Sequence, residues 1–214
     1  MSLIYNPETH TYEFQGIRLP SATQVINEWV LSGSFYVHTL TGVAIPAQAF
    51  EYAGSRGSAV HKGCKLIMAE TIDWDSVEEE IVPPLLQFQA WKEEYYRLGD
   101  SYISETPMMS EKHQFAGTAD LILPVSKEGK KKDIMSIVEI KSSKNYGQVA
   151  AQLAAYEVLY REYARYTKPI VHYVLDLSGE RYKFLKIEDS DAWSFFLHSL
   201  NRCKYLQKQG VNKK

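Results

Sequence analysis

The stretch that decides the fold runs from Gly117-Thr118-Ala119-Asp120 to Val138-Glu139-Ile140-Lys141. It holds two apolar runs that are separated by residues 127–133, a polar loop with one glycine. Two apolar runs around such a loop are typical of a β-hairpin. Charged residues inside apolar strands are costly to bury unless they are paired or bind a metal. The charged residues of this hairpin therefore mark a candidate site.

The expected geometry of the hairpin brings two carboxylates together. Side chains alternate between the faces of a strand, so Glu139 and Lys141 share one face and Ile140 points to the other. A hairpin that folds about the Gly129-Lys130 bond places Asp120 directly opposite Glu139, with Cβ atoms about 5 Å apart. Two carboxylates that close repel each other unless a cation lies between them, and a hard divalent cation is the natural occupant. Lys141 would reach the same site.

Length and composition are those of an ordinary globular domain. The 214 residues are 45% hydrophobic and 23% charged, and we expect one domain over residues 1–214. The net charge of −2 and the pI of about 6.3 provide no global basic field for nucleic acid, but they leave room for a local basic groove. Cys64 and Cys203 are too few for a disulfide scaffold or a four-thiolate cluster. Without a long apolar run or a signal peptide, we expect a cytoplasmic protein with no membrane segment.

The N-terminal residues predict a ribbon followed by one helix. Residues 3–19 predict a small β-ribbon. Ser21 and Gln24 then fit a capping box, and the apolar spacing predicts a helix through Trp29 and Val30 to about residue 32.

The middle of the chain is less regular up to the hairpin. Residues 33–55 fit either a mobile segment over the site or a packed loop. Helical spacing begins at about Ser58 and again at Pro83-Pro84, where a helix runs to Tyr95. Residues 101–109 predict a strand that enters the sheet just before the hairpin.

After the hairpin, a long helix is expected from about Tyr146 to Tyr166. Its apolar face consists of Val149, Leu153, Tyr156, Tyr160 and Tyr163. Residues 170–187 predict a second hairpin, and a last helix is expected over residues 189–207 with Asp189-Ser190-Asp191 as its cap. These elements predict a mixed α/β (α+β) fold with a core over about residues 54–208.

Four short motifs follow one another along these elements: Arg56-Gly57-x-x-x-His61, Gly117-x-x-Asp120, Glu139-x-Lys141 and Gln152-x-x-x-Tyr156. Each alone is weak, because a surface histidine, a solvated strand face or an amphipathic helix produces the same letters. Their joint order resembles the RecB-like, phage-type exonuclease branch of the PD-(D/E)XK nuclease superfamily. The resemblance covers about residues 54–160 well and the N-terminal ribbon more loosely.

The resemblance implies a restriction-endonuclease-like fold, in which helices flank a central mixed β-sheet, and metal-assisted hydrolysis of phosphodiester bonds. One or two Mg²⁺ or Mn²⁺ ions would be held by Asp120, Glu139, His61 and the backbone carbonyl of Ile140. Lys141 would position or deprotonate the attacking water, or neutralise charge on the phosphate.

The resemblance also implies supporting roles. Gln152 and Tyr156 would order the site or contact nucleic acid, and Arg56 would contact phosphate or simply be solvated. Glu105 is a further carboxylate of lower weight as a metal ligand. With two cysteines in the chain, no iron–sulfur cluster is expected.

The first functional hypothesis is a DNA exonuclease that acts in recombination or end processing; an endonuclease and an RNA-active enzyme stay open. A hypothesis of another class is an inert nucleic-acid-binding module of the same fold. The presence of Asp120, Glu139 and Lys141 favours the enzyme, whereas the acidic balance of the chain favours the module. A homo-oligomeric ring around DNA and a recombination or annealing partner are compatible with the exonuclease, but no sequence feature marks an interface.

Overall fold

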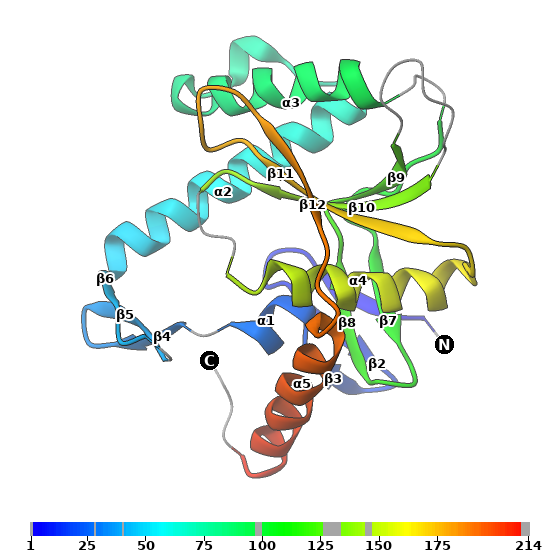
Figure 1. The fold of residues 1–214 in the computed structure, drawn as a ribbon. Coiled ribbons are helices and arrows are strands. Elements are labelled where there is room, and N and C mark those ends of the chain that lie inside the picture. Colours follow the sequence, from blue (N-terminus) through cyan, green and yellow to red (C-terminus); the bar gives the residue numbers. More distant parts are fainter. Residues whose placement is uncertain are drawn as a thin grey trace.

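The computed structural model describes residues 2–27, 29–39, 41–96, 100–125, 134–143 and 147–210, which fold around a central four-stranded sheet (Figure 1). The strand order is β12-β11-β10-β9. The strands are β9 (Leu121–Val125), β10 (Ile134–Lys141), β11 (Ile170–Asp176) and β12 (Lys183–Ile187). Strand β10 is parallel to β11 and antiparallel to β9, and β12 is antiparallel to β11. The predicted mixed sheet in a fold of helices and strands is confirmed at this level.

Helices cover both faces of this sheet. Helices α2 (Ala47–Met68) and α3 (Val82–Tyr95) lie over one face, and α4 (Val149–Ala164) lies over the other (Figure 1). Helices α1 (Ala22–Ile26) and α5 (Ala192–Lys208) pack against α4. Successive residues of β10 enter the two cores in turn: Ile137 packs on the α4 side and Val138 on the α2–α3 side. This alternation explains why β10 is apolar on both faces.

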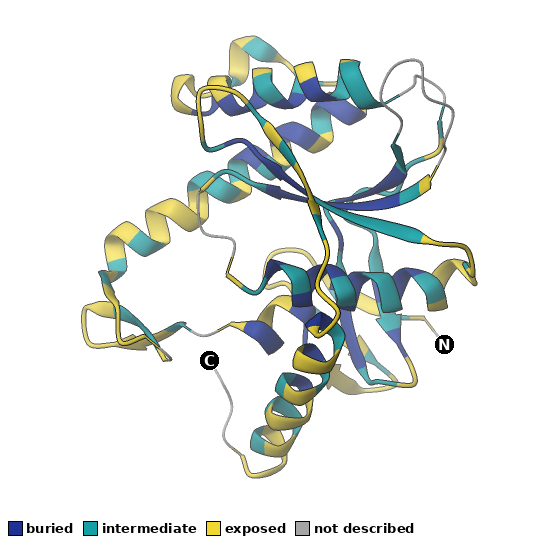
Figure 2. Cartoon of the chain, in the orientation of Figure 1, coloured by how far each residue is buried: buried dark blue, intermediate teal, exposed yellow. Residues whose placement is uncertain are grey.

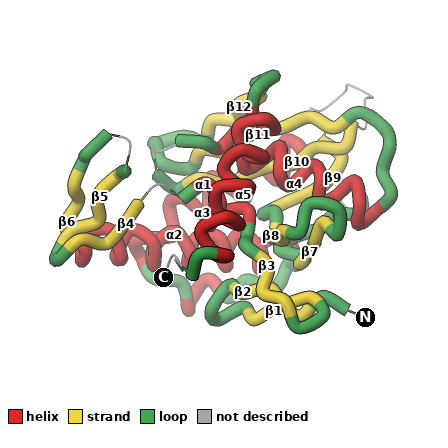
Figure 3. The backbone as a smooth tube through the Cα atoms, turned by 90° about the horizontal axis from the view of Figure 1, so that it is seen from below, coloured by secondary structure: helices red, strands yellow, loops and turns green. Residues whose placement is uncertain are grey.

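The predicted N-terminal ribbon is confirmed as a three-stranded antiparallel sheet. Its strands are β1 (Ile4–Asn6), β2 (Thr11–Phe14) and β3 (Ile17–Leu19). It lies beside the two-stranded pair β7 (Pro107–Ser110) and β8 (Phe115–Thr118), as Figure 3 shows from below. The contact is apolar, because Ala116 of β8 is buried with Tyr12 and Leu19 of the ribbon.

The capping box at the start of α1 is also confirmed, but the predicted length of this helix is wrong. The Gln24 backbone N–H donates to Ser21 Oγ, and the Ser21 N–H donates to Gln24 Oε1, each over 3.1 Å. The helix ends at Ile26, and Asn27 is extended, with φ −70° and ψ 119°. The Asn27 side chain accepts a hydrogen bond from the backbone N–H of Trp29, which holds the chain in a turn instead of a further helical turn.

Residues 29–55 form a projecting arm. Its strands are β4 (Trp29–Ser32), β5 (Phe35–His38) and β6 (Ala44–Pro46), followed by the first turns of α2. Helix α2 therefore begins at Ala47, well before the predicted start near Ser58. The ring of Phe50 stacks on Tyr36 at 4.2 Å, and this aromatic contact ties the strands to the helix. The arm extends away from the central sheet, and most of its surface is exposed (Figure 2).

The predicted strand over residues 101–109 is wrong for most of its length. Ile103 forms one isolated bridge to Ile122 of the central sheet. Glu105 then adopts a left-handed conformation with φ 45°, which turns the chain out of the extended direction. The segment from Pro107 joins β7, in a separate sheet from β9.

Smaller differences concern the last helices and the hairpin loop. Helix α4 begins at Val149, and Tyr163, predicted on its core face, is 55% exposed. Helix α5 begins at Ala192, and its N-cap residue Asp191 makes no side-chain capping bond; the Asp189 carboxylate accepts from the Asp191 N–H instead. The predicted loop at residues 127–133 lies outside the described residues. No helix in the described part of the chain is long and apolar enough to span a bilayer.

The contact between α2 and α3 generates a prediction about two glycines of the same helix. A Cβ at Gly63 would lie 2.6 Å from both terminal methyl carbons of the fully buried Leu85, whereas a Cβ at Gly54 would meet nothing within 4 Å. Gly63→Ala should therefore lower the free energy of unfolding by about 1–3 kcal/mol. Gly54→Ala, the matched control, should raise it by about 0.5–1 kcal/mol, because alanine is the better helix former. Urea unfolding measures both, and a stabilised Gly63→Ala protein would contradict the close packing.

Candidate active site

The end of the β9–β10 ladder positions the first carboxylate. Leu121 pairs with Val138, which is the predicted register, and Asp120 and Glu139 are the next residues beyond this pair. Because β9 begins only at Leu121, the backbone N–H of Ile140 has no β9 residue to bond. The side chain of Asp120 takes that place, and its Oδ2 accepts the Ile140 N–H over 2.7 Å. The Asp120 carboxylate is thus fixed at the strand end.

His61, from α2, contacts the same point from the other side. Its Nδ1 lies 3.1 Å from Asp120 Oδ1, and its Nε2 lies 3.0 Å from the carbonyl oxygen of Ile140. Both ring nitrogens therefore face oxygen acceptors, as suits a protonated imidazole that donates twice. Burial by itself lowers the pKa of His61, but the charge of Asp120 and the hydrogen bond to it outweigh burial and raise this pKa to about 9.

Glu139 and Lys141 form the second part of the site. Glu139 is buried, at 3% exposure, and its Oε1 accepts a hydrogen bond of 2.8 Å from Lys141 Nζ. Its Oε2 is also buried, and no hydrogen-bond partner is found for it in the described part of the protein. The shared strand face predicted for these two residues is therefore confirmed by direct contact.

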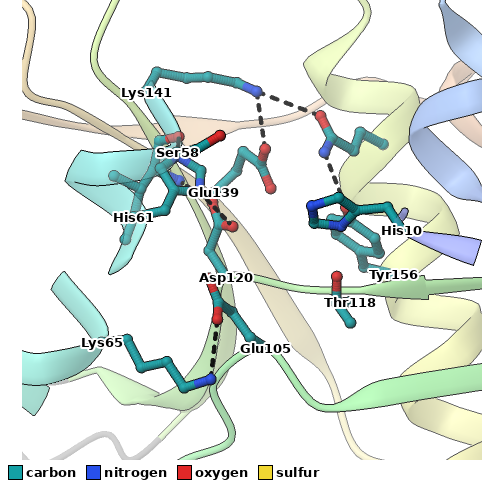
Figure 4. A network of polar contacts seen from close by, with 12 residues as sticks. His10, Ser58, His61, Lys65, Glu105, Thr118, Asp120, Glu139, Lys141 and Tyr156 are labelled. Carbon is teal, nitrogen blue, oxygen red and sulfur yellow. Dashed lines mark hydrogen bonds and ion pairs between the residues drawn. The ribbon is translucent and has the colours of Figure 1, made fainter. Parts of the chain in front are cut away.

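Helix α4 extends this contact into a polar chain. Lys141 Nζ also lies 3.5 Å from Gln152 Oε1, and Gln152 Nε2 donates to the Tyr156 hydroxyl over 3.0 Å. Figure 4 shows Lys141 and Tyr156 reaching the site from β10 and α4, with His61 on the α2 side. Tyr156 fits because β8 carries Gly117 opposite its ring: a Cβ there would lie 3.0 Å from Tyr156 Cε1. The predicted pair on one helix face thus lies beside the carboxylates.

The two carboxylates have opposite electrostatic environments. Burial raises the pKa of Asp120, but the His61 charge and hydrogen bond reverse this effect, so its pKa lies below the usual value. Burial and the nearby charge of Asp120 raise the pKa of Glu139, and Lys141 offsets only part of that rise. Neighbouring acids whose pKa values are driven apart are a recurring feature of catalytic centres.

Two predicted residues lie at the margin of the site. Arg56 Nη1 donates to the backbone carbonyl of Ser142 over 3.5 Å, which ties α2 to the chain just after Lys141. Glu105 makes an ion pair of 3.1 Å with Lys65. Both Glu105 and Lys65 line a small pocket, with a cavity volume of about 10 Å³, together with His61, Asp120 and Ile140. Within the described ranges, no three His, Cys, Asp or Glu side chains are grouped closely enough to form a ready metal cluster.

Sequence reasoning missed Thr23 and Lys65. Thr23, in the Pro20-Ser-x-Thr stretch, hydrogen bonds with Tyr156 and so connects α1 to the polar chain on α4. Lys65 is four residues after His61 on the same helix face, a spacing that could have signalled its place beside the site. Only the fold shows that Glu105 lies opposite it.

The raised pKa of His61 predicts a pH dependence of stability in metal-free buffer. A histidine pKa of about 9 in the folded state, above the unfolded value of 6.5, contributes stability that is complete below pH 6.5 and is lost as the pH rises through about 9. From about pH 6 to pH 10, the wild type in EDTA should lose on the order of 2 kcal/mol more unfolding free energy than His61→Gln. Urea unfolding at several pH values measures this difference, and parallel pH curves for the two proteins would refute the ion pair.

The sequence was also compared with protein-family models and with curated proteins. No protein-family model matches the chain, and no curated protein matches it. A function for this chain is therefore inferred from the residues of the site and their contacts.

Proposed function

We propose that the protein is a metal-dependent nuclease with a restriction-endonuclease-like fold, of the RecB-like kind that its motifs resemble. One observation carries the proposal: Asp120, Glu139 and Lys141 meet at the end of the β9–β10 ladder. A surface ion pair would leave such groups in solvent, where they cost little. Here Glu139 is buried at 3% exposure beside a second acid, an arrangement that a stable sheet does not need.

An orphaned carboxylate oxygen and the donor set of the site favour a hard divalent cation, although the described His, Asp and Glu side chains are not already grouped around one point. The buried Glu139 Oε2 has no hydrogen-bond partner in the described part of the chain, and a bound cation would supply one. Two carboxylates, a backbone carbonyl and an imidazole that releases its extra proton on binding are suitable donors for Mg²⁺ or Mn²⁺. Asp120, Glu139, His61 and the carbonyl of Ile140 would hold the ion. When bound, it would polarise the phosphate and lower the pKa of a coordinated water.

The contacts of Lys141 support one of the roles that the sequence left open. Burial lowers the pKa of Lys141, but the adjacent Glu139 charge more than compensates, and the net pKa is raised. A protonated ammonium donates hydrogen bonds and cannot accept a proton. We therefore assign Lys141 to holding the attacking water or neutralising a phosphate oxygen. Gln152 and Tyr156 restrain the lysine from the α4 side.

The proposed substrate is DNA, and the proposed activity is exonucleolytic, as in phage-type enzymes that process ends in recombination. The proposed compartment is the cytoplasm, where such DNA ends arise. An endonuclease or an RNA-active enzyme would use the same residues, and substrate geometry distinguishes these activities.

The decisive prediction concerns Lys141. End-labelled linear duplex DNA and closed circular DNA are incubated with the purified protein in Mg²⁺, Mn²⁺ or EDTA. Metal-dependent loss of the linear DNA should fall by about 10²–10⁴-fold in Lys141→Ala, because the charge beside the reacting phosphate is removed. The matched control is Lys183→Ala, which removes an exposed lysine from β12 of the same sheet and should retain full activity.

The other outcomes separate the alternatives. Cutting of the circle would identify an endonuclease, and undiminished cleavage by Lys141→Ala would reject the site. If neither DNA is cut but both are bound, the same assay is run on RNA and single-stranded DNA. Inactivity on all four substrates would favour an inert nucleic-acid-binding module.

A further inference from the structure

The ammonium group of Lys65 lies at the edge of the pocket beside Asp120. Lys65 projects from α2 one helical turn after His61, and its Nζ lies 3.1 Å from Glu105 Oε2. Both residues line the same pocket as Asp120 and His61. Figure 4 shows the pair directly next to Asp120, on the side away from Lys141. The site therefore carries an ammonium on each side of its central carboxylates.

The backbone fixes Glu105 in this position. Its φ of 45° is left-handed, a conformation uncommon for a residue with a side chain. Its backbone N–H donates to the carbonyl of Ala119 over 3.0 Å, so it is anchored to the residue that precedes Asp120. The carboxylate of Glu105 is thus presented to the pocket by a segment that is hydrogen bonded to the one that carries Asp120.

We propose that the ammonium of Lys65 takes the place of a second divalent cation beside Glu105, so that the site holds a single metal ion at Asp120 and Glu139. This inference rests on the proposed nuclease function. Without Lys65, Glu105 would be a hard carboxylate ligand that lines the same small pocket as Asp120, and such a pair of carboxylates attracts a divalent ion. With Lys65, the charge of Glu105 is already paired, and a second ion would have to displace this ammonium or bind close to it.

The exposure of the pair makes the arrangement easy to test. The side chain of Lys65 is 52% exposed and that of Glu105 is 35% exposed, so replacing either one leaves no buried unpaired charge. An exposed ion pair also contributes little to stability by itself. A purely structural role would therefore leave metal binding unchanged in a variant that lacks the lysine.

The experiment counts bound Mn²⁺ per chain, by calorimetric titration and by electron paramagnetic resonance of the free ion. It compares four full-length proteins: the wild type, Lys65→Met, the double variant Lys65→Met/Glu105→Gln, and Lys62→Met. Lys62→Met is the matched control, because Lys62 is an exposed lysine on the same helix that does not line the pocket. Circular dichroism in EDTA checks that each protein is folded.

The expected counts are one ion for the wild type, two for Lys65→Met, one for the double variant and one for Lys62→Met. Two ions on the wild type, or a single ion on Lys65→Met, would overturn the inference while leaving the nuclease proposal intact. A wild type that binds no Mn²⁺ and cleaves no substrate would overturn both. A second ion that persists in the double variant would show that Glu105 is not its ligand and would also overturn the inference.

Discussion

Burial of the Glu139 carboxylate at the end of β10 is the constraint on which the site depends. A buried carboxylate must be paired, hydrogen bonded or bound to a metal, because its removal from water is otherwise too costly. The protein meets half of this requirement through Lys141, which is two residues further along the same strand face and contacts one carboxylate oxygen. The other oxygen is buried without a hydrogen-bond partner in the described part of the protein. Strand β10, helix α4 and the polar chain through Gln152 are all arranged around the Glu139 carboxylate.

The end of β9 provides the second determinant. A strand that began two residues earlier would place Ala119 opposite Ile140 and bond the Ile140 N–H through its backbone. Because it begins at Leu121, the side chain of Asp120 accepts that hydrogen bond instead. The same carboxylate then holds His61, and His61 in turn reaches the Ile140 carbonyl. The early end of β9 thus makes the Asp120 carboxylate both a backbone hydrogen-bond acceptor and the centre of a charged cluster. In this cluster the pKa of Asp120 is lowered and the pKa of Glu139 is raised.

Helix α2 connects this cluster to the rest of the molecule. Its second half is buried against the sheet and carries His61, while its first half belongs to the projecting arm. Residues 29–50 contain no Asp, Glu, Lys or Arg, although nearly a quarter of the chain is charged. Several apolar side chains of this uncharged segment are exposed to solvent, among them Val30, Leu31, Phe35 and Val43. Arg56 lies between the two halves and ties the helix to the chain that follows Lys141.

The sequence by itself determined the register of the β9–β10 hairpin, the shared face of Glu139 and Lys141, the capping box of α1 and the stacked pair on α4. Each of these follows from a local rule: strand alternation, a turn centre, a capping pattern or helical spacing. Only the tertiary structure decided where α1 ends, that the arm is built from strands, that residues 101–109 leave the central sheet, and that Lys65 lies opposite Glu105. Those outcomes depend on contacts between distant segments, such as the Tyr36–Phe50 stack and the bond between Glu105 and Ala119. Local patterns do not encode such contacts, because their free energy arises only when the segments meet.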